Sequence, residues 1–108
     1  MKANTLTAER LHALAELYQQ GHVSDLMDRT LEKLLHHEAE QCQAQLRQLQ
    51  DDLAEFEQKY QLSSSEFYRQ FQAGHTSDEM DYVEWASLVQ MAENLEKRLR
   101  LLTGEAVG

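Results

Sequence analysis

Proline is absent from the chain, cysteine occurs once and glycine occurs four times in 108 residues. The missing proline removes the residue that most strongly stops or kinks a helix. A single cysteine, Cys42, excludes a disulfide within the chain and agrees with a reducing compartment. Long apolar runs are missing too, so we expect neither a signal peptide nor a membrane-spanning segment, and we expect a cytoplasmic protein.

Basic side chains are also few, because ten lysines and arginines stand against nineteen acidic residues, for a net charge of −9. This balance argues against non-specific binding to nucleic acid or anionic lipid and favours a basic partner. Residues 1–34 hold four basic and five acidic side chains, whereas residues 35–108 hold six and fourteen, so their net charges are −1 and −8. We therefore distinguish an N-terminal helical segment, residues 1–34, from an acidic, partner-binding region, residues 35–108.

The chain is rich in Leu, Gln, Glu and Ala, which favour helices, and thin in the β-branched residues that favour strands, so we predict an all-α protein. Apolar residues recur at helical spacing over residues 8–20, with Thr7 as the N-cap and Gly21 at the end of this first helix. The preceding residues 1–7 are expected to form a strand or a frayed end.

A second helix is predicted to begin at Ser24, and no glycine or proline stops it before about Tyr60. The sequence leaves open whether this long helix is continuous. Its second half carries two interleaved heptad series, formed by Leu35, Ala39, Cys42, Leu46, Leu49, Leu53, Phe56 and Tyr60. This is the pattern of a helix packed lengthwise against another helix.

Two capping boxes predict two further helices. Ser63 and Glu66 open a short connector helix that ends by Gly74, and Thr76 and Glu79 open the last helix. The last helix carries a second apolar seam, formed by Trp85, Leu88, Ala92, Leu95, Leu99 and Leu102.

The two seams are comparable in length, and a short connector separates them, so we predict that the long helix and the C-terminal helix form an antiparallel, coiled-coil-like hairpin. Five of the eight aromatic residues lie between Glu66 and Leu88. We predict that Phe67, Phe71 and Trp85 fill the corner where the connector meets both long helices.

Side chains capable of metal binding or acid–base chemistry do not form a recognisable site. In the segment HHEAEQC, His36 and Glu40 share one helical face and Glu38 and Cys42 share another, whereas zinc needs three or four converging ligands. The carboxylates of residues 78–84 lie at a helix start, which favours the ionised form, and catalysis would need a raised pKa. We expect no catalytic residue, no metal and no cofactor, and hence no enzyme.

The acidic residues near the aromatics are the candidates for a partner surface, because they would attract a basic groove and tyrosine is a favoured anchor. These partner-binding candidates are Asp51, Asp52, Glu55, Tyr68, Asp78, Asp81, Tyr82 and Glu84. Binding to DNA needs a basic face. The only candidates for it are Lys2, Arg10, Arg29 and Lys33, which a dimer would have to gather on one side.

Two segments resemble parts of bacterial antitoxins. AERLHALAELYQQGHVSDLMDRTLEKLLHHE, residues 8–38, resembles the two helices of ribbon-helix-helix antitoxins, in which a strand precedes the first helix; MKANTLT occupies that place here. SSSEFYRQFQAG and DEMDYVEWASL are similar to a motif of small bacterial proteins that occur as antitoxin partners of small toxins.

The resemblance implies the antitoxin component of a type II toxin–antitoxin system. Such a protein would be a homodimer that binds and neutralises a basic cytoplasmic toxin, typically an RNase, through its acidic C-terminal region. Its N-terminal part, residues 1–34, would form the dimer, and autoregulatory binding of this part to operator DNA is a further expectation. The alternative is a homo-oligomeric coiled-coil scaffold without a toxin partner.

Overall fold

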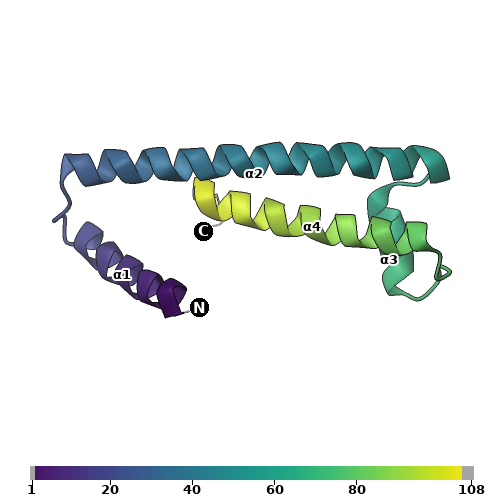
Figure 1. Ribbon diagram of the computed structural model, residues 1–108, viewed down its shortest axis with the longest axis horizontal. Helices are drawn as coiled ribbons and strands as arrows, with labels where there is room; N and C mark the ends of the chain where they lie inside the picture. The colour runs from purple at the N-terminus through teal and green to yellow at the C-terminus, as the bar shows by residue number, and fades with distance from the viewer. Residues whose placement is uncertain (1, 106–108) are drawn as a thin grey trace. The chain divides into compact units, whose positions relative to one another are not determined.

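Every regular element in the computed structural model is a helix over the residues that the structure describes, 2–105, with side chains from residue 4 to residue 105 (Figure 1). The helices are α1 (Lys2–Gln19), α2 (Asp25–Tyr60), α3 (Ser64–Gln72) and α4 (Met80–Thr103). The predicted all-α class is therefore confirmed for this range. Among these residues, no helix combines the length and the apolar character needed to cross a membrane.

The chain divides into two compact units, Met1–Leu34 and Leu35–Gly108, which we call unit 1 and unit 2. Helix α2 runs for 36 residues without a break, which answers the question that the sequence left open. It ends where Gln61 adopts a left-handed conformation with a φ of 52° and the Leu62 amide donates to the Glu57 carbonyl.

The N-terminal prediction is wrong, because α1 begins at Lys2 rather than after Thr7. Residues 2–7 contain no helix breaker, and Leu6 continues the helical repeat of apolar residues, so the helix extends through Thr7. The segment MKANTLT was also a candidate strand, and its residues 2–7 are helical instead. The place where a ribbon-helix-helix protein has its strand is thus occupied by the first turns of α1.

The other predicted helix ends are confirmed in part. Ser24 caps α2 by accepting the Met27 amide at 3.1 Å, and Ser63 caps α3 by accepting the Glu66 amide at 3.2 Å. Gly21 ends the turn after α1 with a φ of 74°, which an L side chain would adopt only with strain.

The capping box at Thr76 and Glu79 is not formed. Helix α4 begins later, at Met80, and its N-cap residue Glu79 makes no side-chain capping bond. The reason is a long-range contact in the first turn of α4, where the Asp81 carboxylate accepts hydrogen bonds from Lys59 and Tyr60 of α2. This contact holds the first turn of α4 against α2. Capping patterns, which involve only neighbouring residues, cannot predict such a contact.

Helices α2 and α4 contact each other in unit 2 and run in opposite directions (Figure 1). The Cys42 thiol of α2 donates to the Leu95 carbonyl of α4 at 3.2 Å, and Lys59 pairs with Asp81 at 2.7 Å. Residue numbers therefore rise along α2 as they fall along α4. Every residue of the two predicted seams is buried or half-buried, as expected for helices that face each other.

The core of unit 2 is built around Trp85, which is fully buried, and Phe67, which is 1% exposed. Their rings stack at a centroid distance of 3.9 Å, and Phe56 and Tyr60 of α2 stack on Trp85 at 5.6 and 5.7 Å. Phe71 packs against the same cluster, so the predicted aromatic corner is confirmed. Truncating either buried ring to alanine would cost about 3–5 kcal/mol.

Unit 1 is a pair of helical segments, α1 and the first residues of α2, without a core of its own. None of its side chains from residue 4 onward is buried. Leu14, Tyr18, Val23 and Leu31 are half-buried, and the Tyr18 hydroxyl donates to Asp28 at 3.2 Å. These few contacts bury less surface than a stable, isolated helix pair normally buries.

Candidate partner-binding groove

A groove of about 340 Å³ lies between α2, α3 and α4 in unit 2. Its floor is apolar and consists of Leu53 from α2 and the buried Val89 and Ala92 from α4. Tyr68 of α3 lines the groove, and the centroid of its ring lies 6.4 Å from the ring centroid of Phe71.

The rim of the groove carries three charged side chains, Arg69 of α3 and Glu93 and Glu96 of α4. Arg69 forms a bidentate ion pair with Glu66, at 2.6 and 2.9 Å, so its positive charge is already compensated. Within the described residues, neither Glu93 nor Glu96 has an ion-pair partner, and both are exposed. The groove therefore combines an apolar floor with an uncompensated negative rim.

Hydrogen bonds from Arg69 and Gln70 and the charge of Arg69 hold the pKa of Glu66 down, to about 2. The carboxylate thus points along α3 to Arg69, which lies three residues on, rather than back to the Ser63 amide as a full capping box would require. It remains ionised at neutral pH and stabilises α3 beside the groove.

Asp81 forms the second perturbed site, at the contact between α2 and α4. Its hydrogen bond to Lys59 and a further one to Tyr60 lower the pKa of Asp81. In return, the hydrogen bond to Asp81 raises the pKa of Tyr60 and of Lys59. All three groups are held in their ordinary ionisation states, whereas a general acid or base needs a pKa near the working pH. The arrangement acts as a clamp between two helices.

The metal-capable residues of α2 point to different partners. His36 lies 3.3 Å from Glu40, Glu38 lies 3.9 Å from Arg98, and the Cys42 thiol is buried against α4. In the part of the chain that the structure describes, no three His, Cys, Asp or Glu side chains converge as metal ligands.

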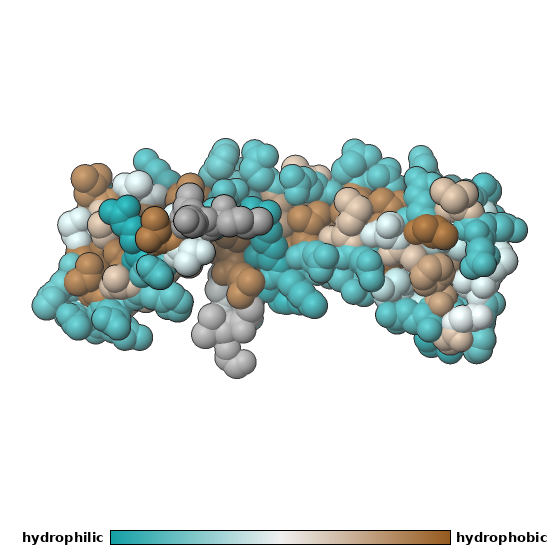
Figure 2. Space-filling model, turned by 60° about the horizontal axis from the view of Figure 1, so that its bottom comes forward, coloured by the Kyte–Doolittle hydropathy of each residue, from teal (hydrophilic) through white to brown (hydrophobic). Residues whose placement is uncertain are grey.

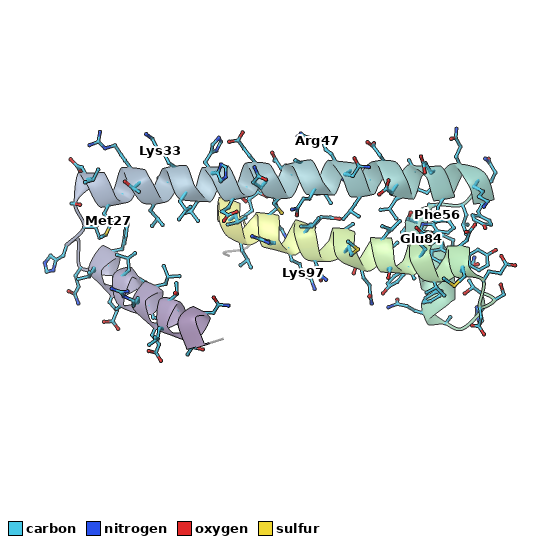
Figure 3. The ribbon with its side chains drawn as sticks, viewed as in Figure 1. Met27, Lys33, Arg47, Phe56, Glu84 and Lys97 are labelled. Atoms are coloured by element: carbon cyan, nitrogen blue, oxygen red, sulfur yellow. The ribbon has the colours of Figure 1, made fainter. Side chains whose placement is uncertain are left out.

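The predicted acidic surface is divided among several places. Asp51 and Glu55 lie four residues apart on α2 and are exposed, whereas Asp52 is half-buried and accepts a hydrogen bond from Gln48 at 3.2 Å. Glu84, which comes from α4 (Figure 3), is exposed. Asp78, which precedes the start of this helix, is also exposed.

The remaining three candidates contribute to packing. Tyr68 lines the groove, and Asp81 belongs to the clamp with Lys59. Tyr82 packs between Tyr60, at a centroid distance of 5.3 Å, and Phe67, at 5.8 Å. Of the eight residues, only Tyr68 lies in the groove itself.

The candidates for DNA contact lie in unit 1. Arg10, Arg29 and Lys33 are exposed, and Arg29 and Lys33 share one side of α2 because they are four residues apart. The side chain of Lys2 lies outside the described residues.

Glu93, Glu96 and Ser64 line the groove but were not among the residues predicted from the sequence. Glu96 follows the predicted seam residue Ala92 by four positions and Glu93 follows Val89 by four, so both lie at the edge of the face that α4 turns to the core. That spacing was visible in the sequence. The role of Ser64, which accepts a hydrogen bond from the Trp85 indole, was not, because the two residues are 21 positions apart.

No protein family, curated protein or solved structure matches this chain in the comparisons.

Proposed function

We propose that this chain is a binding protein whose unit 2 docks a basic partner protein in the groove of Leu53, Tyr68, Ala92, Glu93 and Glu96. The observation that carries the proposal is the uncompensated negative rim around an apolar floor. Such a site fits an aliphatic or aromatic side chain of the partner flanked by lysine or arginine, with Tyr68 as the anchor on this side.

The partner that we propose is a basic toxin, because two segments of the chain resemble bacterial antitoxins. Direct binding in the cytoplasm neutralises the toxin, and no step of chemistry is required of this chain. The contact between α2 and α4 supports this role, because two helices that pack against each other give the groove rigid walls.

Co-expression with the product of the adjacent gene tests the proposal. That product should arrest growth when it is expressed alone, and co-expression of this chain should restore growth and yield a complex. The antitoxin proposal fails if the adjacent product neither binds nor is toxic alone.

A pair of charge-reversed variants then tests the site. Glu93→Lys with Glu96→Lys reverses the groove rim, and Asp51→Lys with Glu55→Lys makes the same charge change on exposed positions of α2. The rim pair should lower the association rate constant at least about tenfold and weaken its salt dependence. The α2 pair should have a much smaller effect. Equal effects of the two pairs would show attraction by overall charge without a groove.

A further inference from the structure

A second cavity of unit 2, which we call the elbow cavity, has a volume of about 260 Å³. It lies between the end of α2, helix α3, the loop that follows α3 and the first turns of α4 (Figure 1). No residue lines both this cavity and the partner-binding groove. Figure 2 shows hydrophobic and hydrophilic residues side by side on the surface at this end of unit 2. The elbow cavity is therefore a separate site of mixed character.

The backbone after α3 holds one side of the elbow cavity in place. The Gly74 amide donates to the Phe71 carbonyl at 3.1 Å, and the His75 amide donates to the Gln70 carbonyl at 2.9 Å. These two bonds form a Schellman motif, in which Gly74 takes the left-handed position with a φ of 77°. The loop residues 75–77 thus line the cavity in a fixed arrangement, and a ligand would not have to order them.

The rim of the elbow cavity carries polar groups without partners. Within the described residues, the hydroxyls of Thr76, Ser77 and Tyr82 and the ring nitrogens of His75 make no hydrogen bond. Gln70 uses only the nitrogen of its side-chain amide, so its oxygen remains as an acceptor. The rim therefore offers both donors and acceptors to the edge of a ligand.

The back of the elbow cavity is aromatic. Phe67 and Trp85 are 1% and 0% exposed, and their rings stack on each other at a centroid distance of 3.9 Å. Because their faces cover each other, they meet the cavity with their edges. Ring edges are partly positive and attract the π face of a flat aromatic molecule, which a sugar ring lacks.

The volume of the elbow cavity limits the size of its ligand. An apolar cavity of about 150 Å³ is large enough for benzene. The elbow cavity, at about 260 Å³, therefore fits a molecule of two fused rings.

The charges in and around the elbow cavity exclude an ionised ligand. Among the described residues, no Asp, Glu, Lys or Arg lines it, so a buried charge would have no counter-ion. Asp78 and Glu79 directly follow the lining residue Ser77, and neither forms an ion pair in the part of the chain that the structure describes. Their carboxylates repel an anion at the entrance.

We propose that the elbow cavity binds a small uncharged heterobicycle, a free purine base or nucleoside. The fused ring lies against the aromatic back, and its edge, which carries both donors and acceptors, meets the rim hydroxyls, His75 and Gln70. This inference is independent of the partner protein proposed for the groove.

Isothermal titration calorimetry of the full chain tests the ligand class with three probes. Adenosine should bind with a Kd on the order of 100 μM, which a typical affinity per atom gives for its size. 5′-AMP has the same ring and an added phosphate, so it should bind at least about tenfold more weakly. Glucose has hydroxyl groups but no aromatic ring, and it should not bind in this range.

A matched pair of variants tests the place of binding. Tyr82→Phe removes one rim hydroxyl and keeps the packed ring, so it should weaken adenosine binding roughly three- to tenfold. Thr76→Val removes a second rim hydroxyl and should act in the same direction. Tyr68→Phe makes the same change on a half-buried tyrosine of α3 that does not line the elbow cavity, and it should leave adenosine binding unchanged.

Four results would overturn the proposal. These are no adenosine binding at millimolar concentration, equal affinity for adenosine and 5′-AMP, binding of glucose instead of adenosine, and equal effects of Tyr82→Phe and Tyr68→Phe. Circular dichroism of each variant confirms that a weaker affinity does not come from unfolding.

Discussion

The hydrogen bond between Trp85 and Ser64 allows a direct test of how the core of unit 2 is stabilised. The indole Nε1 donates to the Ser64 hydroxyl at 2.9 Å, and Trp85 has no exposed surface. In Ser64→Ala the indole N–H remains buried and loses its acceptor. An unsatisfied buried donor costs about 1–3 kcal/mol, more than the net gain from an ordinary exposed hydrogen bond.

Ser64 is the first residue of α3, so alanine there also changes helix propensity. That term favours alanine by roughly 0.5 kcal/mol and partly masks the loss. Ser65→Ala is the matched control, because Ser65 is the next residue of the same helix and is exposed. We expect Ser64→Ala to be less stable than Ser65→Ala by about 1–3 kcal/mol, or roughly 4–8 °C in Tm for each kcal/mol.

The assay uses the intrinsic fluorescence of Trp85, the single tryptophan of the chain. Urea unfolding of both variants gives the stability difference, and emission before unfolding reports whether water reaches the ring. A double-mutant cycle with Trp85→Phe, followed by circular dichroism, isolates the pair. The reasoning is refuted if Ser64→Ala and Ser65→Ala unfold together, or if the cycle gives no coupling between positions 64 and 85.

Two further predictions concern α3 and its end. The pKa of Glu66 is about 2 in the folded chain against an ordinary 4.5. The ionised carboxylate therefore stabilises the folded chain fully above pH 4.5, and this contribution is lost as the pH falls towards 2. Thermal melts of wild type and Glu66→Gln should therefore differ most at neutral pH and converge in acid; a constant difference would contradict the assignment. Gly74 has a φ of 77° and open space around its Cα. Gly74→Ala should lower the unfolding free energy by about 1 kcal/mol through backbone strain alone, and Gly74→Asn by less, because asparagine tolerates this conformation. Equal stability of all three chains in urea would show that the turn relaxes.

Local patterns predicted the helices and the buried seams well. The heptads placed Cys42 and Leu49 in the interior of α2, and the spacing on α4 placed Trp85 and Ala92 there; all four are buried. These predictions succeed because helical periodicity is set by residues within a few turns of one another. The same reasoning recognised the serine caps and the left-handed glycine after α1.

Contacts between distant residues were not predictable in this way. The start of α4 depends on the contact of Asp81 with Lys59, which is 22 positions away, and no sequence rule links these two side chains. The N-terminal error has a different cause. Thr7 is a good N-capping residue, so it predicted that the helix starts there. The residues before it are also compatible with a helix, and α1 therefore begins earlier, at Lys2.

The acidic residues of unit 2 separate into those that hold the fold and those that can meet a partner. Glu57 accepts the Ser64 amide at 2.8 Å, Glu66 pairs with Arg69, and Asp81 clamps α4 to α2. Glu93 and Glu96 have no such partner within the described residues, so their negative charges stay uncompensated beside the groove. Because like charges repel, the acidic surplus of residues 35–108 disfavours contact between two copies of unit 2.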